Sequence, residues 1–233
     1  MSVNYNPQIF TKDMVLCLDA ANPVSLLPSS GTWTDLSKEK NTGNLTNGAS
    51  YSSENLGAIQ FDGTNDYVNL QNKLLWNSFG DKLTVEVFFK LEGGVGNYPR
   101  IVAKQSTGLT TATSCFQIGI LNNSAFRWSV RTSNGSIDAS ASSVSQGVNY
   151  HFVGTYDGTA MKAYVNGEEI INRSLTGNIL TSAQPLTLGL TYFDRTVNYG
   201  FPGKLYAVKM YKAALTQNQV KQNFYALRGR YEI

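Results

Sequence analysis

Charge is scarce in this chain of 233 residues, because Asp, Glu, Lys and Arg supply only 15% of it. A typical soluble domain has about a quarter. No apolar run approaches the roughly 18 residues that a membrane-spanning helix requires. Residues 1–10 also lack the basic start and apolar stretch of a secretory signal. We therefore predict no membrane insertion and no secretory signal.

Histidine and cysteine are almost absent, with one His and two Cys in the chain. Zinc sites need several such ligands, and a Ser-His-Asp or Cys-His centre would have to use His151. Since His151 lies inside a predicted strand, we interpret it as structural. Cys17 and Cys115 make no disulfide framework, so we predict two buried free thiols. A glycine-rich phosphate loop is also missing.

Amide and hydroxyl side chains are abundant instead. Asn, Ser and Thr make up more than a quarter of the chain, which also has 21 Gly, 13 Tyr and 11 Phe. A helical bundle would be rich in Ala, Glu, Lys and Leu, and a disordered chain would lack aromatics. The composition predicts an all-β protein with many turns.

Hairpin signals and alternating apolar residues locate the strands. Asp157-Gly158 and Asn166-Gly167 are two-residue hairpin turns, because Gly adopts positive φ freely and Asn and Asp tolerate it. The alternation over Leu83–Lys90 places one apolar face on that strand. The predicted strands are Met14–Leu18, Ala58–Phe61, Tyr67–Leu70, Leu83–Lys90, Arg100–Lys104, Cys115–Leu121, Phe126–Val130, Tyr150–Tyr156, Met161–Val165, Glu168–Ile171, Leu186–Leu190 and Lys204–Tyr211.

One helix is predicted near the C-terminus. Thr216 and Gln219 have the spacing of a capping box. Val220, Phe224 and Leu227 follow at the spacing of one apolar helix face, which predicts that the helix docks on the strands. Gly229 is the expected stop.

Many strands followed by one helix, without βα alternation or repeats, predict an all-β domain of two stacked antiparallel sheets. We place this domain at residues 13–233 and an N-terminal arm at residues 1–12. The arm has too little apolar content to fold alone. Ile9 and Phe10 are its expected anchors, either on a neighbouring molecule or at the base of its own domain.

The carboxylates do not fit glycoside hydrolysis, which needs two acids about 5 Å apart. On a strand such a pair needs Glu-x-Asp spacing, which is absent. Glu168 and Glu169 are adjacent and point to opposite faces, and Glu86 is expected on the polar side of its strand. Asp62 and Asp66 could bind calcium, but a turn in which they bond their own backbone is the favoured interpretation.

Two predicted loops, 96–100 and 191–199, carry the residues that suit binding. Aromatic rings fit the apolar face of a sugar, and Asn, Asp and Arg hydrogen-bond to hydroxyls. The same residue types also suit a protein interface. Sugar binding and protein binding both stay open at this point.

The segments Phe61–Val68, Leu83–Lys90, Tyr150–Gly158, Tyr164–Gly167 and Gly203–Thr216 resemble the concanavalin A-like lectin/glucanase superfamily, in its laminin-G-like, pentraxin-like branch. The resemblance spans nearly the whole chain. It implies a jelly-roll sandwich whose ligand and calcium sites lie on rim loops. The acid triplet of the glucanases is missing, so the resemblance carries no enzymatic activity to this chain.

The matching rim stretches lie near Lys104-Gln105 and over Tyr192–Asn198. Asp194 is their only acid, so we predict no metal site and no cofactor, with calcium as the alternative. The candidate ligand-binding residues are Tyr98, Arg100, Gln105, Tyr192, Asp194, Arg195, Asn198 and Tyr199.

The segments Asn6–Ile9, Leu16–Pro23, Gly31–Ser37 and Leu227–Tyr231 are similar to a narrower group, common in tailed-bacteriophage virion proteins. This resemblance implies a non-enzymatic virion surface protein, a capsid decoration or fibre-associated subunit that can bind glycans. We expect it to assemble in the host cytoplasm as a homo-oligomer, with capsid or fibre proteins and a cell-surface glycan as partners and no nucleic acid. The alternatives are a soluble carbohydrate-binding lectin module and, third, a glycosidase.

Overall fold

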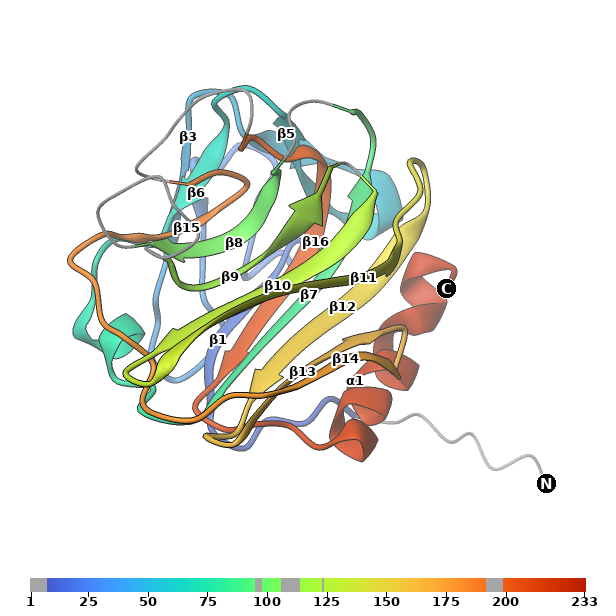
Figure 1. Cartoon of the computed structure of the whole chain (residues 1–233). Helices are drawn as coiled ribbons and strands as arrows, with labels where there is room; N and C mark the ends of the chain where they lie inside the picture. The colour runs from blue at the N-terminus through green and yellow to red at the C-terminus, as the bar shows by residue number, and fades with distance from the viewer. Residues whose placement is uncertain (1–7, 95–97, 106–113, 123, 192–198) are drawn as a thin grey trace.

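Two antiparallel sheets packed face to face form the protein, with one α-helix on the outside (Figure 1). This computed structural model describes residues 8–94, 98–105, 114–122, 124–191 and 199–233. Sheet A has the strand order β14-β13-β12-β7-β16-β5-β4, with β1 also paired to β16, and sheet B has the order β11-β10-β9-β8-β15-β6-β3-β2. The arrangement confirms the predicted all-β sandwich and is consistent with a jelly roll.

The elements have the following bounds. The strands are β1 (Met14–Asp19), β2 (Thr32–Trp33), β3 (Gly43–Thr46), β4 (Ser50–Ser52), β5 (Ala58–Asp62), β6 (Tyr67–Asn69), β7 (Leu83–Leu91), β8 (Arg100–Gln105), β9 (Ser114–Leu121), β10 (Ala125–Thr132), β11 (Gly135–Ser143), β12 (Asn149–Tyr156), β13 (Ala160–Val165), β14 (Glu168–Ser174), β15 (Leu186–Leu188) and β16 (Pro202–Tyr211). The 3-10 helices are η1 (Glu54–Leu56) and η2 (Leu74–Asn77), and the α-helix is α1 (Gln217–Tyr231).

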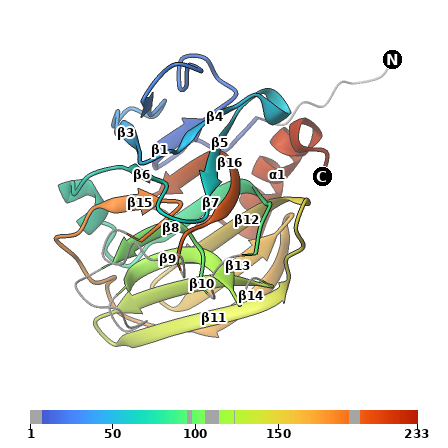
Figure 2. The same ribbon diagram turned by 90° about the horizontal axis from the view of Figure 1, so that it is seen from above.

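Every predicted strand is present, but the sequence analysis missed β2, β3, β4 and β11. Of these β11 matters most for the site described below. It is the edge strand of sheet B, next to β10, and Figure 2 shows it on the outside of the molecule near β14. Four of its nine residues are exposed serines, and Ala139 is the one buried residue. An edge strand buries little apolar surface, so its sequence carries only a weak alternation.

The core lies between the sheets. Leu83, Val85, Val87 and Phe89 of β7 all belong to it, as the alternation predicts. Sheet B contributes Trp128, whose Nε1 donates to the carbonyl oxygen of Thr155 at 3.2 Å. A Cβ on Gly154 would lie 2.5 Å from the Trp128 ring. Glycine at this position therefore lets the indole pack directly on the backbone of sheet A.

The predicted meander is confirmed as β12, β13 and β14. Asn166 and Gly167 adopt φ values of 51° and 85° at its second turn. Positive φ at both central residues defines the tight hairpin turn that Asn-Gly favours.

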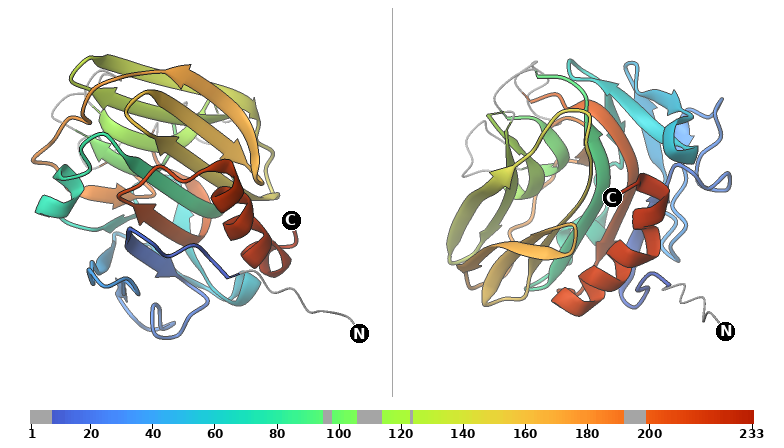
Figure 3. Two further views of the ribbon diagram at one scale, coloured as in Figure 1. Left: turned by 90° about the horizontal axis from the view of Figure 1, so that it is seen from below. Right: turned by 90° about the vertical axis from the view of Figure 1, so that its right-hand side faces the viewer.

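Helix α1 covers the outer face of sheet A, on the opposite side of the sandwich from the green strands of sheet B (Figure 3, right). Its capping box forms as predicted, with the Thr216 side chain accepting from the Gln219 backbone N–H. Val220 and Phe224 are buried, and the half-buried Leu227 packs beside them, so the predicted docking is confirmed.

The predicted end of the helix at Gly229 is wrong. The helix continues to Tyr231, and Glu232 then adopts a left-handed φ of 54°. Tyr231 is buried, with its ring 4.7 Å from that of Phe88 and 5.1 Å from that of Tyr206. The burial of this ring outweighs the tendency of glycine to end a helix.

A buried polar network joins α1 to sheet A around Glu86, and we call it the Glu86 network. Lys209 Nζ lies 3.0 Å and His151 Nε2 lies 3.2 Å from Glu86 Oε1. Asn223 Nδ2 of α1 donates to Glu86 Oε2 at 2.6 Å, and the Tyr211 hydroxyl donates to the same atom at 3.4 Å. Glu86 lies on the predicted face of β7, but this face is sealed by α1 and does not contact solvent.

This network fixes the ionisation of its members. Burial by itself would raise the pKa of Glu86, but the charge of Lys209 and the hydrogen bond from His151 outweigh it and lower the pKa to about 2. Burial lowers the pKa of His151, although Glu86 opposes the shift. His151 is stacked on Phe88 with a centroid distance of 4.3 Å, which agrees with its predicted structural role.

Ile9 and Phe10 pack against the protein's own domain, beside α1 and β16. The Phe10 N–H donates to Asn223 Oδ1 at 2.7 Å, and the Tyr211 hydroxyl donates to the Phe10 carbonyl at 3.1 Å. Residues 1–7 of the predicted arm lie outside the described residues. Arm and domain boundaries stay predictions.

Cys17 and Cys115 are buried and unpaired, as predicted. Burial raises the pKa of both thiols to about 11, so they are unreactive at neutral pH. In the part of the chain that the structure describes, no helix has the length and apolar character that crossing a membrane requires.

Candidate functional site

Two arginines lie side by side on the outer face of sheet B. The register places Arg100 of β8 opposite Gly119 of β9, and Gly119 opposite Arg127 of β10. A Cβ on Gly119 would lie 2.3 Å from the carbonyl oxygen of Pro99. Because Gly119 has no side chain, the backbone of Pro99, next to Arg100, can approach β9 closely.

Two tyrosines lie against these guanidiniums. The rings of Tyr98 and Tyr199 are stacked, with centroids 6.1 Å apart. Arg100 Cζ lies 5.9 Å from the Tyr98 centroid and 5.3 Å from the Tyr199 centroid, and Arg127 Cζ lies 5.6 Å from the Tyr98 centroid. Such distances give favourable cation–π contacts. We name Tyr98, Arg100, Arg127, Asp138 and Tyr199 the arginine–tyrosine cluster.

Asp138 of the edge strand β11 neutralises one of the two arginines. Arg127 Nε donates to Asp138 Oδ1 at 2.6 Å and Arg127 Nη2 donates to Oδ2, which makes a two-point ion pair. The Ser129 hydroxyl also donates to Oδ1. Burial would raise the pKa of Asp138, but these partners outweigh it and lower the pKa. Asp138 is therefore fully committed to Arg127.

Arg100 has no such partner. Its side chain is buried, with 3% of its surface exposed, and its Nε and Nη1 have no hydrogen-bond partner. Nη1 of Arg127 is also unpartnered. Burial, together with the charge of Arg127, lowers the pKa of Arg100 to about 9. At neutral pH the group is still charged, and Asp138, whose charge opposes the shift, makes its ion pair with Arg127 instead.

Three of the residues predicted from the sequence meet in this cluster, namely Tyr98, Arg100 and Tyr199. Gln105 lies at the other end of β8, with its Oε1 unpartnered. Tyr192, Asp194, Arg195 and Asn198 lie outside the described residues.

Sequence reasoning missed Arg127 and Asp138. Arg127 stands between the core residues Phe126 and Trp128 in a correctly predicted strand. That alternation was the available signal, since it places Arg127 on the outer face. No comparable signal existed for Asp138, because β11 itself was not predicted.

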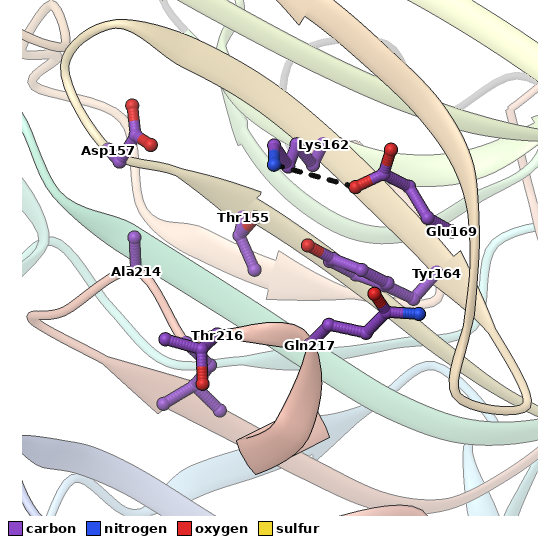
Figure 4. A pocket seen from close by; sticks show the side chains of 9 residues that line it. Thr155, Asp157, Lys162, Tyr164, Glu169, Ala214, Thr216 and Gln217 are labelled. Carbon is purple, nitrogen blue, oxygen red and sulfur yellow. Dashed lines mark ion pairs between the residues drawn. The ribbon is translucent and has the colours of Figure 1, made fainter. Parts of the chain in front are cut away.

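A second polar site is a pocket of about 250 Å³ on the opposite side of the molecule, between sheet A and the start of α1 (Figure 4). Lys162 and Glu169 point toward each other in it and form an ion pair of 3.5 Å. Asp157 Oδ1 accepts from the N–H groups of Thr159 and Ala160 at 2.8 and 2.7 Å. A ligand in this pocket would have to break these hydrogen bonds and the ion pair. In the arginine–tyrosine cluster, by contrast, some guanidinium N–H groups have no hydrogen-bond partner.

The carboxylates of Asp62 and Asp66 bond the backbone of their own turn. Asp62 Oδ1 accepts from the Thr64 N–H at 2.7 Å, and Asp66 Oδ2 accepts from the Asp62 N–H at 3.0 Å. This is the geometry of the Asx-rich turn that the sequence favoured. Among the described residues, no three His, Cys, Asp or Glu side chains gather to hold a metal ion.

Comparison with protein families agrees with this architecture. A family model described as the concanavalin A-like lectin/glucanases superfamily matches residues 62–221. The chain belongs to this superfamily, and its fold is a lectin- and glucanase-like carbohydrate-binding fold. A search among curated proteins finds no match.

Solved structures share the fold at low sequence identity. The binding domain of Paraclostridial Mosquitocidal Protein 1 is 16% identical, with a TM-score of 0.70 over 92% of this chain and 52% of that chain. A sialidase of Trypanosoma rangeli is 13% identical, with a TM-score of 0.70 over 95% of this chain and 34% of that chain. This chain thus spans about half of the first protein and a third of the second.

A third similar structure is a single domain of about the same length. Domain 4 of AbnA, an extracellular arabinanase from Geobacillus stearothermophilus solved with arabinotriose, is 17% identical. Its TM-score is 0.65, over 91% of this chain and 98% of that chain. At these identities the likeness establishes the fold.

Proposed function

We propose that the protein is a non-catalytic carbohydrate-binding module whose ligand lies against the arginine–tyrosine cluster. The observation that carries the proposal is a stacked tyrosine pair next to buried guanidiniums whose N–H groups have no acceptor. Tyr98 is 37% exposed, so its ring can receive the apolar face of a sugar. The free N–H groups can donate to sugar oxygens.

The Tyr98→Ala variant is expected to bind glycans about fivefold more weakly than the wild type, because it loses one stacking ring worth roughly 1 kcal/mol. A glycan array followed by titration calorimetry measures the change. Tyr225→Ala is the matched control, since Tyr225 is 50% exposed on α1 and also lies near an arginine, with Arg228 Cζ 5.3 Å from its centroid. Equal loss in both variants, or a wild type that binds no glycan, would contradict the proposal.

We also propose that the protein is not an enzyme. Carboxylate oxygens of Glu54 and Glu92 both lie 2.6 Å from Lys204 Nζ. Among the described residues, we regard these two carboxylates as the best candidates for a catalytic pair. Burial would raise their pKa values, but Lys204 and Lys90 lower that of Glu54 to about 2 and also lower that of Glu92. A glycosidase needs one carboxyl that keeps its proton near neutral pH, and neither meets this requirement.

We therefore expect no release of reducing sugar from β-glucans. The assay should include Glu54→Gln, Glu86→Gln and Asp194→Asn, which remove the principal acids considered above. Turnover by the wild type that disappears in one of these variants would prove the protein an enzyme.

A role on a bacteriophage virion is the finer proposal, and it rests on the similarity of four short sequence segments to virion proteins. In it, the module is a capsid decoration or fibre-associated subunit, assembled in the host cytoplasm as a homo-oligomer, that binds a cell-surface glycan. The second candidate is a soluble lectin module, which uses the same cluster. Mass spectrometry of purified particles separates the two, because only the virion protein would be retained on them.

A further inference from the structure

We propose that the glycan bound by the arginine–tyrosine cluster is acidic, and that its carboxylate accepts hydrogen bonds from the free N–H groups of Arg100. This inference rests on the carbohydrate-binding function proposed above and specifies the chemical class of the sugar. It follows from the hydrogen-bond donors, the charge and the placement of the aromatic rings.

The first argument is the state of the buried cations. Arg100, Lys104, Arg127 and Lys209 are the buried basic residues in the described part of the chain. Lys209 has Glu86, Arg127 has Asp138, and the Lys104 ammonium donates to carbonyl and amide oxygens of the neighbouring loops. In Arg100, by contrast, Nε and Nη1 have no acceptor. Unpaired buried donors are costly, so an acceptor from outside the chain would be strongly favoured.

The net charge of the arginine–tyrosine cluster also favours an acidic ligand. Two guanidiniums and one carboxylate make up the charged part of the cluster, and both oxygens of Asp138 are already engaged by Arg127. Asp138 also acts electrostatically on Arg100, but it makes its ion pair with Arg127, so two guanidiniums share one carboxylate and the cluster keeps a net positive charge. A neutral hydroxyl can accept a hydrogen bond there but cannot balance the charge, whereas a carboxylate does both.

The third argument is the position of Tyr98. Its ring centroid lies within 6 Å of both Arg100 Cζ and Arg127 Cζ. Of the two tyrosines in the cluster, Tyr98 is the more exposed to solvent. The N–H groups of Arg100 are buried in the free protein, so in the proposed complex the acid group of the ligand has to enter past the edge of this ring. The body of the sugar then rests on the two tyrosine rings. A hexuronic acid or a sialic acid has this combination of an apolar ring face and a carboxylate.

The experiment compares sugars that carry an acid group with neutral sugars of otherwise similar structure. Calorimetric titration would use sialyllactose against lactose, trigalacturonate against a neutral galactose trimer, and sulfated galactose as the other anion. We expect each carboxylate probe to bind at least tenfold more tightly than its neutral partner, and this preference to shrink in 0.5 M salt. Equal affinity for acidic and neutral probes would overturn the inference and leave the proposed function standing, whereas no binding of any sugar would remove both.

The sulfated probe shows whether the cluster prefers a carboxylate or accepts any anionic group, such as a sulfate ester. Binding of sulfated galactose but not of either carboxylate probe would overturn the carboxylate assignment. Binding of the carboxylate probes alone, or more tightly, supports it.

The variant that tests the residue is Arg100→Met, which keeps an unbranched but shorter side chain and removes the charge. We expect it to lose the preference for acidic probes, whereas the affinity for neutral ones, which rests mainly on the tyrosine rings, falls less. Its melting temperature without ligand should equal or exceed that of the wild type, because an unpaired buried charge is removed. Arg228→Met is the control, because the exposed Arg228 lies over the ring of the exposed Tyr225 on α1, and its replacement should leave binding unchanged.

Thermal unfolding of the wild type provides a readout that does not depend on any variant. Excess sialyllactose or trigalacturonate should raise its melting temperature more than the neutral sugar does. A melting temperature of Arg100→Met several degrees below that of the wild type would show that Arg100 is a structural cation, and would overturn the inference.

Discussion

The Glu86→Ala variant is expected to lower the free energy of unfolding by about 3–5 kcal/mol, the usual effect of removing one partner of a buried ion pair. Lys209 would stay buried next to Phe88, whose centroid lies 5.0 Å from Lys209 Nζ, without its counter-charge. Asn223 of α1 would lose its acceptor at the same time. Denaturation in urea measures the change.

The Glu86 network also predicts how stability depends on pH. The pKa of Glu86 is about 2 in the folded protein, below its ordinary value, so its contribution is complete above about pH 4.5 and is lost as the pH falls toward 2. The pKa of His151 is also lowered on folding, so protonation of the unfolded chain removes stability already below about pH 6.5. Both groups act in the same direction, and the urea midpoint of the wild type should fall on acidification.

Glu169→Ala is the control for this prediction. Glu169 pairs with Lys162 at 3.5 Å, but both side chains are about one-third exposed. An exposed pair of this kind contributes about 1 kcal/mol or less. If Glu86→Ala and Glu169→Ala had equal effects, or if the acid dependence of Glu86→Ala between pH 4.5 and 2 matched that of the wild type, the assigned role of the network would be wrong.

The Phe224→Ala variant is expected to cost about 3–5 kcal/mol of unfolding free energy, because a buried aromatic side chain is lost and a cavity remains. Phe224 lies in the contact between α1 and sheet A, with its ring stacked 5.8 Å from that of His151. It is 7% exposed, so most of its surface is withdrawn from water. Differential scanning calorimetry provides the measurement.

Tyr225→Ala is again the matched control, because the adjacent Tyr225 is 50% exposed. Exposed positions of this kind usually change stability by less than about 0.5 kcal/mol. An unchanged melting temperature of Phe224→Ala would mean that α1 does not hold the sandwich together in solution.

The two outer faces of the sandwich differ in how their polar groups are satisfied. On sheet A, α1 covers the face and supplies Asn223 to Glu86, and Lys209 and His151 complete the set. On sheet B, the described residues leave Arg100 without an acceptor. His151 Nδ1 on sheet A is also unpartnered, but α1 seals this face, whereas Tyr98 over Arg100 is 37% exposed. This contrast supports the proposal that the ligand binds on sheet B.

The sequence by itself determined the class of fold and the anchoring of the helix. Alternation along Leu83–Lys90, the turns at Asp157-Gly158 and Asn166-Gly167, and the capping box at Thr216 are local signals, and each acts over fewer than about ten residues. Local patterns of this kind decide which segments become strands and where a helix begins. They also placed Arg100 on a strand next to Tyr98, and with Tyr199 three of the five residues of the candidate site could be predicted.

Only the tertiary structure decided which distant residues meet. Asp138 reaches Arg127 through the pairing of β10 with β11, an edge strand whose weak apolar pattern gave no signal. Glu86 is buried because α1, more than 100 residues later in the chain, covers it, and Tyr231 extends that helix past Gly229 by packing against Phe88. Pairing across sheets and burial under a helix depend on long-range contacts, and a local pattern contains no information about its partner. For this reason the charge left unpaired at Arg100 is visible only in the folded protein.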